Sequence, residues 1–475
     1  MNFFSYIVCW DEVYNNVLNI ENDFTSLNVP HKVINSGSRL HDNWMNVGDI
    51  RYYRQLHKAV KDFDRSYEYM FWLAGDVSYN NWSDFIDRAN ESVSLYNVFA
   101  YAPHLTSEPW HEGSSKIINL TLDNKMLLSI QTDGIAVILH KDIVDMLEKY
   151  LDFVADKTDI TQLTSGWGMD MIWSAYSIYM NKLVLRDNMH ILNHPAGSSY
   201  GHDRASKELK IILDLFYEFC DDNKIDSIKI RNIHEKIYGR MQRREDCLHV
   251  DSFYSTSPEI LKNTYPINYH IIHIDDTRLS NRKSLQEVLN GEKIDIPCLN
   301  AKKDGEIDLF KQNNPEFKFA WDGFKLGEIG NFGSHYLAWK YLRQSNLNEL
   351  IVFEDDALID YTFHQKFQTS MNLLPKDYDI FSIYVDKNQH PRFDESQRIS
   401  YHIAKGYQDW STLCYVISKR GAEKLCKYVE EIGFDHPTDW FIFRKGHQGI
   451  FNVYTLPPYI ENPLSIDSRY ESQVQ

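Results

Sequence analysis

Short apolar runs that stop at an acidic residue recur along this chain. Residues 6–10 end at Asp11, residues 69–75 end at Asp76, and residues 350–353 end at three consecutive carboxylates. Each run has the length and continuous hydrophobicity of a strand that is buried on both faces. Amphipathic segments that suit helices accompany these runs, at 49–63, 141–153 and 419–431. The alternation predicts an α/β protein with acids at the carboxyl ends of its strands.

The alternating pattern begins twice, which predicts two domains. A basic helical stretch and a loop with Ser and Pro at 224–267 separate the two series, and the second series opens with the apolar run at 269–274. A chain of 475 residues is also too long for a single hydrophobic core. We therefore expect one domain at 1–223, a connector at 224–267 and a second domain at 268–475.

Several landmarks recur in the same order in the two halves. Residues 139–150 align without gaps on 417–428, at an offset of 278. Two aspartates repeat at similar separations: Asp76 with Asp356, 280 apart, and Asp170 with Asp439, 269 apart. The order of elements therefore predicts two copies of one α/β domain.

The composition restricts the classes of ligand. Hydrophobic residues make up 43% and charged residues 25%, which is the balance of a folded, soluble chain. Aromatic residues reach 14%, which favours carbohydrate or nucleotide ligands because rings stack on both. The net charge of −17 repels polyphosphate backbones, so we expect no nucleic-acid partner.

The cysteines and the first residues indicate the compartment. The six cysteines are scattered and form no C-x-x-C pair, which argues against zinc ribbons and against a disulfide framework. The chain opens without a basic region followed by a long apolar segment, and no apolar run has the length of a membrane span. We expect a cytoplasmic protein, in the host cytoplasm if the chain is viral, with no transmembrane segment.

The triple carboxylate Glu354-Asp355-Asp356 is the strongest chemical signal. Carboxylate oxygens hold Mg²⁺ and Mn²⁺, and ligands of open α/β sheets bind beyond the carboxyl ends of strands. A metal-bound nucleotide is therefore expected here. Two alternatives stay open: a solvated acidic turn, and a two-metal site that hydrolyses phosphate esters.

A second kind of acid stands at the start of a predicted helix. Asp170 follows Gly166-Trp167-Gly168, and Asp439 follows Pro437-Thr438. Transfer of a sugar from a nucleotide needs a metal for the departing diphosphate and a carboxylate for the proton of the attacking hydroxyl. The helix-start aspartates suit the second task, although a simple helix-capping role is the alternative. A histidine in the loop at 193–202 is a further candidate metal ligand.

From residue 268 onward the sequence resembles glycosyltransferase family 25, whose members extend lipopolysaccharide or galactosylate collagen. The shared motifs occur in family order over about two hundred residues. They are Gly327-Glu328-Ile329-Gly330, Ser334-His335 with Trp339, residues 351–356, residues 415–419 with Gly421-Ala422 and Leu425, and Pro437-Thr438-Asp439.

This resemblance implies a GT-A type fold and an inverting transfer that depends on Mn²⁺ or Mg²⁺, often with UDP-galactose as donor. It implies metal binding by Glu354 and Asp356, contact of Asp355 with the sugar or the metal, and activation of the acceptor by Asp439. The resemblance also implies donor contacts by Asp275, Arg278, Arg282 and His335. His273 stands where the family usually has an asparagine, and the two arginines come late.

The N-terminal half resembles a different set of inverting GT-A galactosyltransferases through its Gly-Trp-Gly segment. The resemblance implies that Asp170 activates the acceptor and that Trp167 contacts the donor. Asp76 stands where such enzymes keep a metal-binding Asp-x-Asp, as the one acid present, and His194 would be the late metal ligand.

The sequence thus predicts two tandem GT-A type domains that add hexoses, galactose among them, from nucleotide sugars to a glycan, lipopolysaccharide or glycoprotein acceptor. In one alternative only the C-terminal domain is catalytic, and the N-terminal domain is a degenerate module that binds donor or acceptor. In another, the chain is a carbohydrate-binding assembly protein without catalysis.

Overall fold

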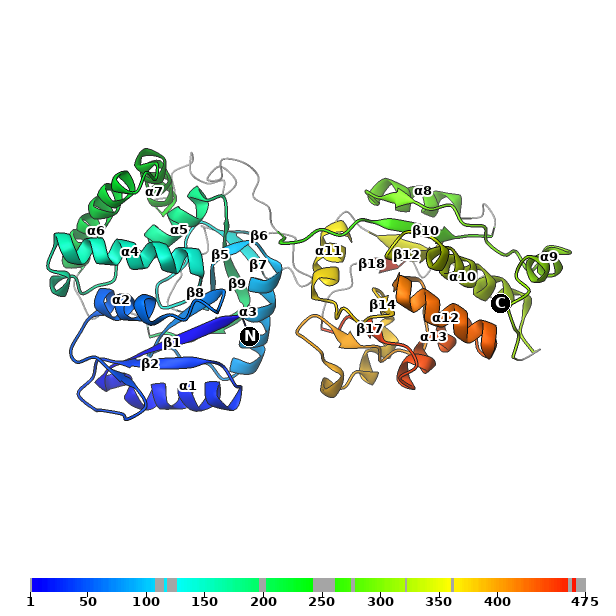
Figure 1. Ribbon diagram of the computed structural model, residues 1–475, viewed down its shortest axis with the longest axis horizontal. Helices are drawn as coiled ribbons and strands as arrows, with labels where there is room; N and C mark the ends of the chain where they lie inside the picture. The colour runs from blue at the N-terminus through cyan, green and yellow to red at the C-terminus, as the bar shows by residue number, and fades with distance from the viewer. Residues whose placement is uncertain are drawn as a thin grey trace. The chain divides into compact units, whose positions relative to one another are not determined.

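The computed structural model describes residues 2–106, 115–117, 126–195, 202–241, 261–274, 278–320, 323–359, 363–459 and 464–466. The chain divides into two compact units, which we call unit 1 and unit 2 (Figure 1). Unit 1 comprises Met1–Ile118 and Asn124–Lys262, and unit 2 comprises Asn119–Asp123 and Asn263–Gln475. No helix in the described part of the chain is long and apolar enough to cross a bilayer.

Unit 1 is built on a mixed sheet of nine described strands in the order β3-β2-β1-β4-β8-β5-β9-β7-β6. The strands are β1 (Phe3–Cys9), β2 (His31–Asn35), β3 (Met45–Asn46), β4 (Tyr69–Ala74), β5 (Val98–Leu105), β6 (Ser115–Ile117), β7 (Met126–Ser129), β8 (Ala136–His140) and β9 (Leu183–Leu192). The helices are α1 (Tyr14–Ser26), α2 (Tyr52–Asp62), α3 (Trp82–Leu95), α4 (Lys141–Lys157), α5 (Met169–Tyr179), α6 (His202–Asp222) and α7 (Ser227–Met241).

Unit 2 has a seven-stranded mixed sheet in the order β11-β10-β12-β16-β14-β17-β15, and a separate antiparallel pair, β13 with β18, among its described residues. The strands are β10 (Asn268–Ile272), β11 (Glu292–Lys293), β12 (Glu349–Glu354), β13 (Ala357–Ile359), β14 (Ile380–Ser382), β15 (Ala404–Lys405), β16 (Cys414–Ser418), β17 (Val453–Thr455) and β18 (Leu464–Ile466). The helices are α8 (Leu279–Val288), α9 (Glu306–Asn313), α10 (Leu326–Gln344), α11 (Phe363–Leu373), α12 (Lys419–Glu431) and α13 (Thr438–His447).

The two sheets have one topology. With β3 and β6 left out, both sheets place their strands, ranked by chain order, as second, first, third, sixth, fourth, seventh and fifth. Each neighbouring pair also has the same parallel or antiparallel sense in both sheets. The predicted fold class, two tandem α/β domains with mixed sheets, is confirmed.

Strand register supports the same correspondence. In unit 1, Tyr69 of β4 pairs with His140 of β8. In unit 2, Glu349 of β12 pairs with Ser418 of β16. The two residues of the first pair stand 280 and 278 positions before those of the second, which are the offsets found in the sequence. A one-residue slip would turn every side chain to the other face of the sheet, so the shared register is a specific agreement.

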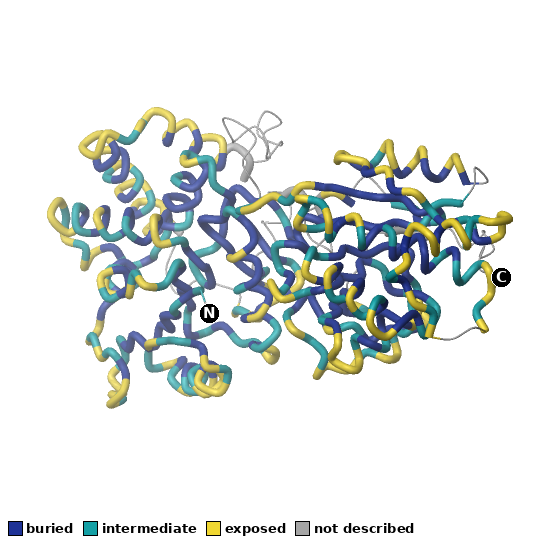
Figure 2. The backbone as a smooth tube through the Cα atoms, turned by 45° about the vertical axis from the view of Figure 1, so that its right-hand side comes forward, coloured by how far each residue is buried: buried dark blue, intermediate teal, exposed yellow. Residues whose placement is uncertain are grey.

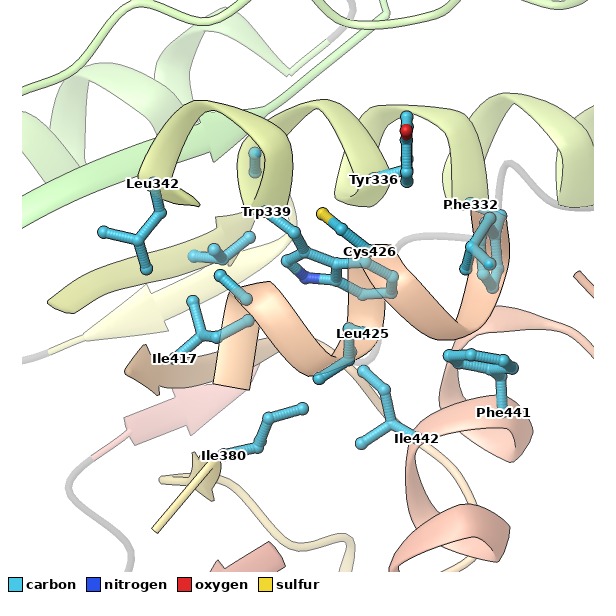
Figure 3. Close-up of a cluster of buried hydrophobic side chains, with 14 of the residues drawn as sticks. Phe332, Tyr336, Trp339, Leu342, Ile380, Ile417, Leu425, Cys426, Phe441 and Ile442 are labelled. Atoms are coloured by element: carbon cyan, nitrogen blue, oxygen red, sulfur yellow. The ribbon is translucent and has the colours of Figure 1, made fainter. Parts of the chain in front are cut away.

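Strand β12 is apolar throughout because both of its faces are covered. Leu350 and Val352 pack into a cluster with α10, α12 and α13, which Figure 3 shows around Trp339. Ile351 and Phe353 point to the opposite face and pack with α8 and α11. Burial of each such side chain contributes about 2 kcal/mol, so β12 is firmly held up to the residue where its acids begin. In both units the strands are the most buried segments (Figure 2).

The segment expected to connect the domains is partly structured. Helix α7 packs against α5 and α6 within unit 1, and the contact boundary between the units falls after Lys262. Ile230, Ile233 and Ile237 are buried on one helical face, which explains the packing.

Candidate active site in unit 2

A pocket of about 70 Å³, open to solvent, lies at the carboxyl ends of β10 and β12. The walls come from five segments: the end of β10 with His273 and Ile274, Arg278 before α8, residues 299–302, the first turns of α10, and Glu354 to Asp356.

Glycine lets α10 approach the pocket wall closely. A Cβ atom on Gly330 would lie 2.9 Å from the carbonyl oxygen of Leu299, and one on Gly333 would lie 2.5 Å from the Leu299 side chain. Glycine inside a helix costs about 1 kcal/mol relative to alanine, so its place here has a packing reason. The glycine-rich start of α10, seen first as a motif, thus brings Asn331 and Ser334 to the pocket.

Asp355 and Asp356 share one arginine. Arg278 Nη1 lies 3.0 Å from Asp355 Oδ1 and 3.1 Å from Asp356 Oδ2. The other two oxygens, Asp355 Oδ2 and Asp356 Oδ1, are buried and have no hydrogen-bond partner. Burial, followed by the negative charge of Glu354, raises the pKa of Asp356 to about 6. Burial also raises the pKa of Asp355, against the lowering effect of Arg278.

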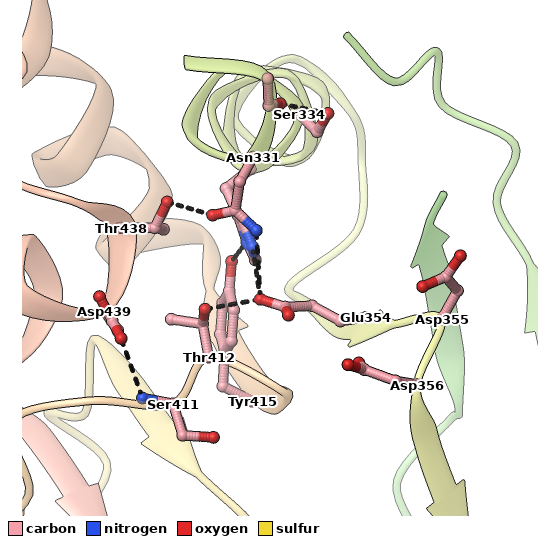
Figure 4. A network of polar contacts seen from close by, with 12 residues as sticks. Asn331, Ser334, Glu354, Asp355, Asp356, Ser411, Thr412, Tyr415, Thr438 and Asp439 are labelled. Atoms are coloured by element: carbon pink, nitrogen blue, oxygen red, sulfur yellow. Dashed lines mark hydrogen bonds and ion pairs between the residues drawn. The ribbon is translucent and has the colours of Figure 1, made fainter. Parts of the chain in front are cut away.

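The pKa of Glu354 is shifted in the opposite direction to those of Asp355 and Asp356. The Oε1 atom of Glu354 accepts hydrogen bonds from Thr412 Oγ1 at 2.7 Å, His335 Nε2 at 3.3 Å and Asn331 Nδ2 at 3.4 Å (Figure 4). Burial by itself raises the pKa of Glu354, but the three hydrogen bonds and His335 outweigh it and lower the pKa below its usual value. Glu354 is therefore ionised beside a carboxylate that takes up a proton more readily.

A directed chain of hydrogen bonds stands behind Glu354. The indole of Trp339, which only donates, donates to the hydroxyl of Tyr415 at 2.9 Å. The Tyr415 hydroxyl lies 2.7 Å from His335 Nδ1 and directs its own proton there. The ring is thereby oriented so that its Nε2 atom faces Glu354. His335 is fully buried and thus orients Glu354 from the core side.

Asp439 stands at the start of α13 on the other side of Glu354. Its Oδ2 atom accepts from the backbone N–H of Ser411 at 3.2 Å, and its Oδ1 atom accepts from the N–H of Trp440 at 2.8 Å. Burial raises the pKa of Asp439 above its usual value, in spite of these two bonds. Ser411 has a φ of +85°, a strained value for a residue with a side chain, which the surrounding contacts maintain.

Hydrogen bonds and peptide bonds join Glu354 and Asp439 in a closed ring. Thr438 Oγ1 donates to Asn331 Oδ1 at 2.5 Å, and Asn331 donates to Glu354, while Thr412 reaches Glu354 from the other side. We call this set the carboxylate ring, and it runs through Glu354, Thr412, Ser411, Asp439, Thr438 and Asn331. The ring fixes the two carboxylates relative to each other.

The structure brings most of the predicted unit 2 residues together. Glu354, Asp355, Asp356 and Arg278 line the pocket, and Asp439 joins them through the carboxylate ring. Arg282 is buried on α8, His335 lies behind Glu354 and does not line the pocket, and Asp275 is outside the described residues.

Three participants were missed by sequence reasoning. They are Asn331, Thr412 and Tyr415.

A divalent cation suits the free oxygens of this pocket. Among the described residues, no three His, Cys, Asp or Glu side chains are close enough to enclose an ion by themselves. Two buried carboxylate oxygens nevertheless lack partners, and Mg²⁺ and similar ions often take one or two carboxylates and complete their shell with water and substrate phosphates. The residues fit an ion shared with a ligand.

The corresponding place in unit 1 has a smaller cluster. Asp76 follows β4 as Asp356 follows β12, and His194 Nε2 lies 3.3 Å from Asp76 Oδ2. Asp76 Oδ1 is buried without a hydrogen-bond partner. The two residues expected to bind a metal in unit 1 are therefore side by side.

Asp170 is the second residue of α5, as Asp439 is of α13. It accepts a hydrogen bond from Gln131, and burial, followed by the charge of Asp133, raises its pKa to about 6. Trp167, two residues before α5, accepts a hydrogen bond at its carbonyl from the Tyr53 hydroxyl. The Gly-Trp-Gly turn is thereby fixed against α2.

Residues 267–442 match a family model described as glycosyltransferase family 25 (LPS biosynthesis protein). The resemblance predicted from the motifs of the C-terminal half is confirmed. The matched range contains the whole carboxylate ring and every residue that lines the pocket.

Curated relatives match part of the chain. Procollagen galactosyltransferase 1-A of Xenopus laevis is 35% identical over 166 residues, which are 32% of this chain and 26% of the relative. Procollagen galactosyltransferase 2 of Homo sapiens is 35% identical over 146 residues, 29% of this chain and 23% of the relative. A Bos taurus protein named probable inactive glycosyltransferase 25 family member 3 is 33% identical over 118 residues, 23% of this chain and 19% of the relative. The chain thus spans about a quarter or less of the length of these relatives.

One solved structure is similar at a low level. It is titled as a glycosyltransferase involved in the glycosylation of the major capsid of PBCV-1. It is 12% identical with a TM-score of 0.24, and the match covers 44% of this chain and 98% of that one. Similarity of this degree informs neither the fold nor the site.

Proposed function

We propose that unit 2, whose sequence matches glycosyltransferase family 25, transfers a hexose from a nucleotide sugar to a hydroxyl of a glycan acceptor. The carboxylate ring is the observation that carries this proposal. It holds an ionised Glu354 at the pocket and, at a fixed position beside it, an Asp439 whose pKa is raised. Two carboxylates whose pKa values are pushed apart suit separate tasks in one reaction.

The pocket would receive the donor. Segments after β10 and at 299–302 form one wall for the nucleoside, and Arg278 supplies a guanidinium for the diphosphate. UDP-galactose is the donor we propose to test first, because the most similar relatives are named galactosyltransferases.

Mn²⁺ or Mg²⁺ would be held by Asp356 and Glu354, with Asp355 facing the ion or the sugar. Glu354 Oε2 accepts no hydrogen bond within the described chain, and Asp356 Oδ1 is buried without a partner, so each has an oxygen to offer. Bound there, the cation neutralises the charge that develops on the departing diphosphate.

Asp439 would act as the general base. The acceptor hydroxyl oxygen attacks the anomeric carbon, the bond from that carbon to the diphosphate oxygen breaks, and the hydroxyl proton passes to Asp439. A single displacement of this kind inverts the anomeric configuration. A pKa above the usual aspartate value makes Asp439 a stronger base than an exposed aspartate.

A second transferase site in unit 1 is supported by a specific correspondence. Asp76 with His194, and Asp170 at the second position of α5, occupy places that match Asp356 and Asp439 in an equivalent sheet. Unit 1 has one strand-end acid where unit 2 has three, so its metal site would be weaker.

The test is a panel of nucleotide sugars incubated with the full chain, Mn²⁺ and glycan acceptors, with nucleoside diphosphate and glycoside measured together. Two active units predict that Asp356→Asn and Asp76→Asn each remove one activity. Loss only in Asp356→Asn leaves unit 1 as a binding module. A wild-type chain that binds sugars but turns over no donor would refute the catalytic role.

A further inference from the structure

Two exposed tryptophans flank the candidate base. Asp439 accepts hydrogen bonds from two backbone N–H groups, those of Trp440 and Ser411. Trp440 is 39% exposed, and Trp410, the residue before Ser411, is 36% exposed. The contacts that fix the carboxylate therefore also fix the backbone beside two large aromatic rings that remain open to solvent.

An arginine guanidinium lies against each of these rings. The guanidinium of Arg444 lies 4.0 Å from the centre of the Trp440 ring, and that of Arg392 lies 5.3 Å from the centre of the Trp410 ring. Arg444 is one helical turn after Trp440 on α13, so the two share a face. Cation–π contact holds the guanidinium over the indole and prepares both groups for a ligand.

Arg444 differs from the neighbouring basic residues because no carboxylate of the described residues pairs with it. Arg392 is paired with Asp409, and Lys445 lies 2.7 Å from Asp435. Within the described chain, the polar partner of Arg444 is His436 Nε2 at 3.2 Å, and no carboxylate contacts the guanidinium. A guanidinium has five N–H donors, so Arg444 retains both its charge and unused donors beside the base.

We infer that Trp440, Arg444 and Trp410 form an acceptor subsite for an anionic glycan, in which the acceptor presents a sugar face to tryptophan and a carboxylate or phosphate to Arg444. This inference rests on the proposed role of Asp439 as the base that activates the acceptor. Arginine pairs with carboxylate and phosphate groups in a forked geometry, and indole rings offer a large apolar surface with little entropy to lose.

The same charge disfavours an acceptor that carries an amine. An ammonium group placed next to the indole of Trp440 would meet the guanidinium of Arg444 at close range, and like charges repel. The subsite thus selects an acidic sugar over an amino sugar or a lysine-containing peptide, and this selection is measurable without a donor.

The experiment titrates the full chain, without donor, with three disaccharides that differ in charge. Glucuronosyl-β-1,4-glucose is the acidic probe, cellobiose the neutral probe, and glucosaminyl-β-1,4-glucosamine the amine probe, each followed by calorimetry or by saturation-transfer NMR. Arg444→Gln removes the charge, and Trp440→Ala removes the ring. Lys311→Gln is the matched control, because Lys311 lies 5.0 Å from the centre of the Phe319 ring elsewhere in unit 2.

We expect the wild type to bind the acidic probe about fivefold to tenfold more tightly than cellobiose, and the amine probe most weakly. Arg444→Gln should reduce the affinity for the acidic probe to that for cellobiose and leave cellobiose binding unchanged. Trp440→Ala should weaken both probes, and Lys311→Gln neither. Unchanged thermal unfolding of each variant confirms that the fold is retained.

Equal binding of the acidic and neutral probes, tighter binding of the amine probe, or no binding of any probe would overturn the inference. So would an acid preference that persists in Arg444→Gln. The proposed function is tested separately. If the chain turns over no donor while binding of the acidic probe still depends on Arg444, the subsite is supported and the catalytic role is refuted.

Discussion

The hydroxyl of Tyr415 lies 2.7 Å from Nδ1 of His335, and this contact fixes the orientation of a fully buried ring. Because Trp339 donates to the same hydroxyl, the proton of Tyr415 points to His335, and the proton of His335 points to Glu354. The ionised state of Glu354 at the pocket is thus set from the hydrophobic core.

Tyr415→Phe should damage both stability and activity. The change leaves the Trp339 indole N–H and the His335 Nδ1 atom buried without a partner, which costs about 1–3 kcal/mol for each such group. Urea denaturation measures the loss, and turnover of the donor should fall beyond what the remaining folded fraction explains. Tyr454→Phe on β17, which removes a hydrogen bond from the Tyr454 hydroxyl to Asp377, is the control and should leave turnover unchanged.

Asn331→Asp should impair transfer more than Asn331→Ala. The aspartate would place a negative oxygen where Nδ2 now donates to Glu354 at 3.4 Å, so the two carboxylates would repel. We expect a fall in kcat of about tenfold for Asn331→Asp, with a smaller fall for the alanine variant. Asn372→Asp on α11 adds the same charge away from the pocket and should not change kcat. Equal rates for the two Asn331 variants would contradict the role of the ring.

Ser411 offers a test of backbone strain. At a φ of +85°, glycine is unstrained and a β-branched residue is disfavoured by about 1–3 kcal/mol. Ser411→Gly should therefore keep the folding stability and the N–H bond to Asp439, whereas Ser411→Val should lose stability and transfer rate together. Thermal unfolding and single-turnover rates measure the two effects, and a fully active valine variant would show that this N–H does not position Asp439.

Asp170 should give unit 1 a pH-dependent stability. Its pKa is raised from 3.8 to about 6, so the folded state binds the proton more tightly than the unfolded state. This contribution is fully present below about pH 4 and is lost as the pH rises through about 6, with a decline of up to about 3 kcal/mol. Asp170→Asn should lack that decline in urea denaturation between about pH 4 and pH 7.

The control for this measurement is an exposed acid in the same unit. Asp214 on α6 pairs with Lys210 at the surface, so Asp214→Asn should retain the wild-type pH dependence. A decline of the same size in Asp170→Asn and the wild type would contradict the assignment.

Much of the fold could be predicted because its signals are local. The apolar run before Glu354 shows a strand covered on both faces, and the repeat of residues 139–150 at 417–428 shows a duplicated unit. The spacing of four between His335 and Trp339 is typical of residues on one helical face, but it does not show that this face packs inward. The resemblance implied a donor contact for His335, and the structure places its ring behind Glu354.

The carboxylate ring could not be predicted because its contacts span distant parts of the chain. Thr438 donates a hydrogen bond to Asn331, which is 107 positions away in the sequence, and Thr412 donates one to Glu354, which is 58 positions away. Neither Asn331 nor Thr412 belongs to a local motif for a catalytic site. A single sequence, without an alignment to its relatives, carries no signal that links them to Thr438 and Glu354. The packing of α7 could not be predicted for a related reason, since α7 looks like a solvated basic helix until its isoleucines are seen to pack on α5 and α6.

The central claim is that Asp439 activates an acceptor hydroxyl beside the pocket that Glu354 and Asp356 line. The most direct measurement is the rate of sugar transfer by Asp439→Asn with the best donor from the panel, together with the affinity of the variant for the nucleoside diphosphate. We predict a loss in kcat of about 100-fold or more, unchanged nucleotide affinity and, in the wild type, a product of inverted anomeric configuration. An Asp439→Asn variant that transfers sugar at the wild-type rate, or a wild-type product of retained configuration, would contradict the account.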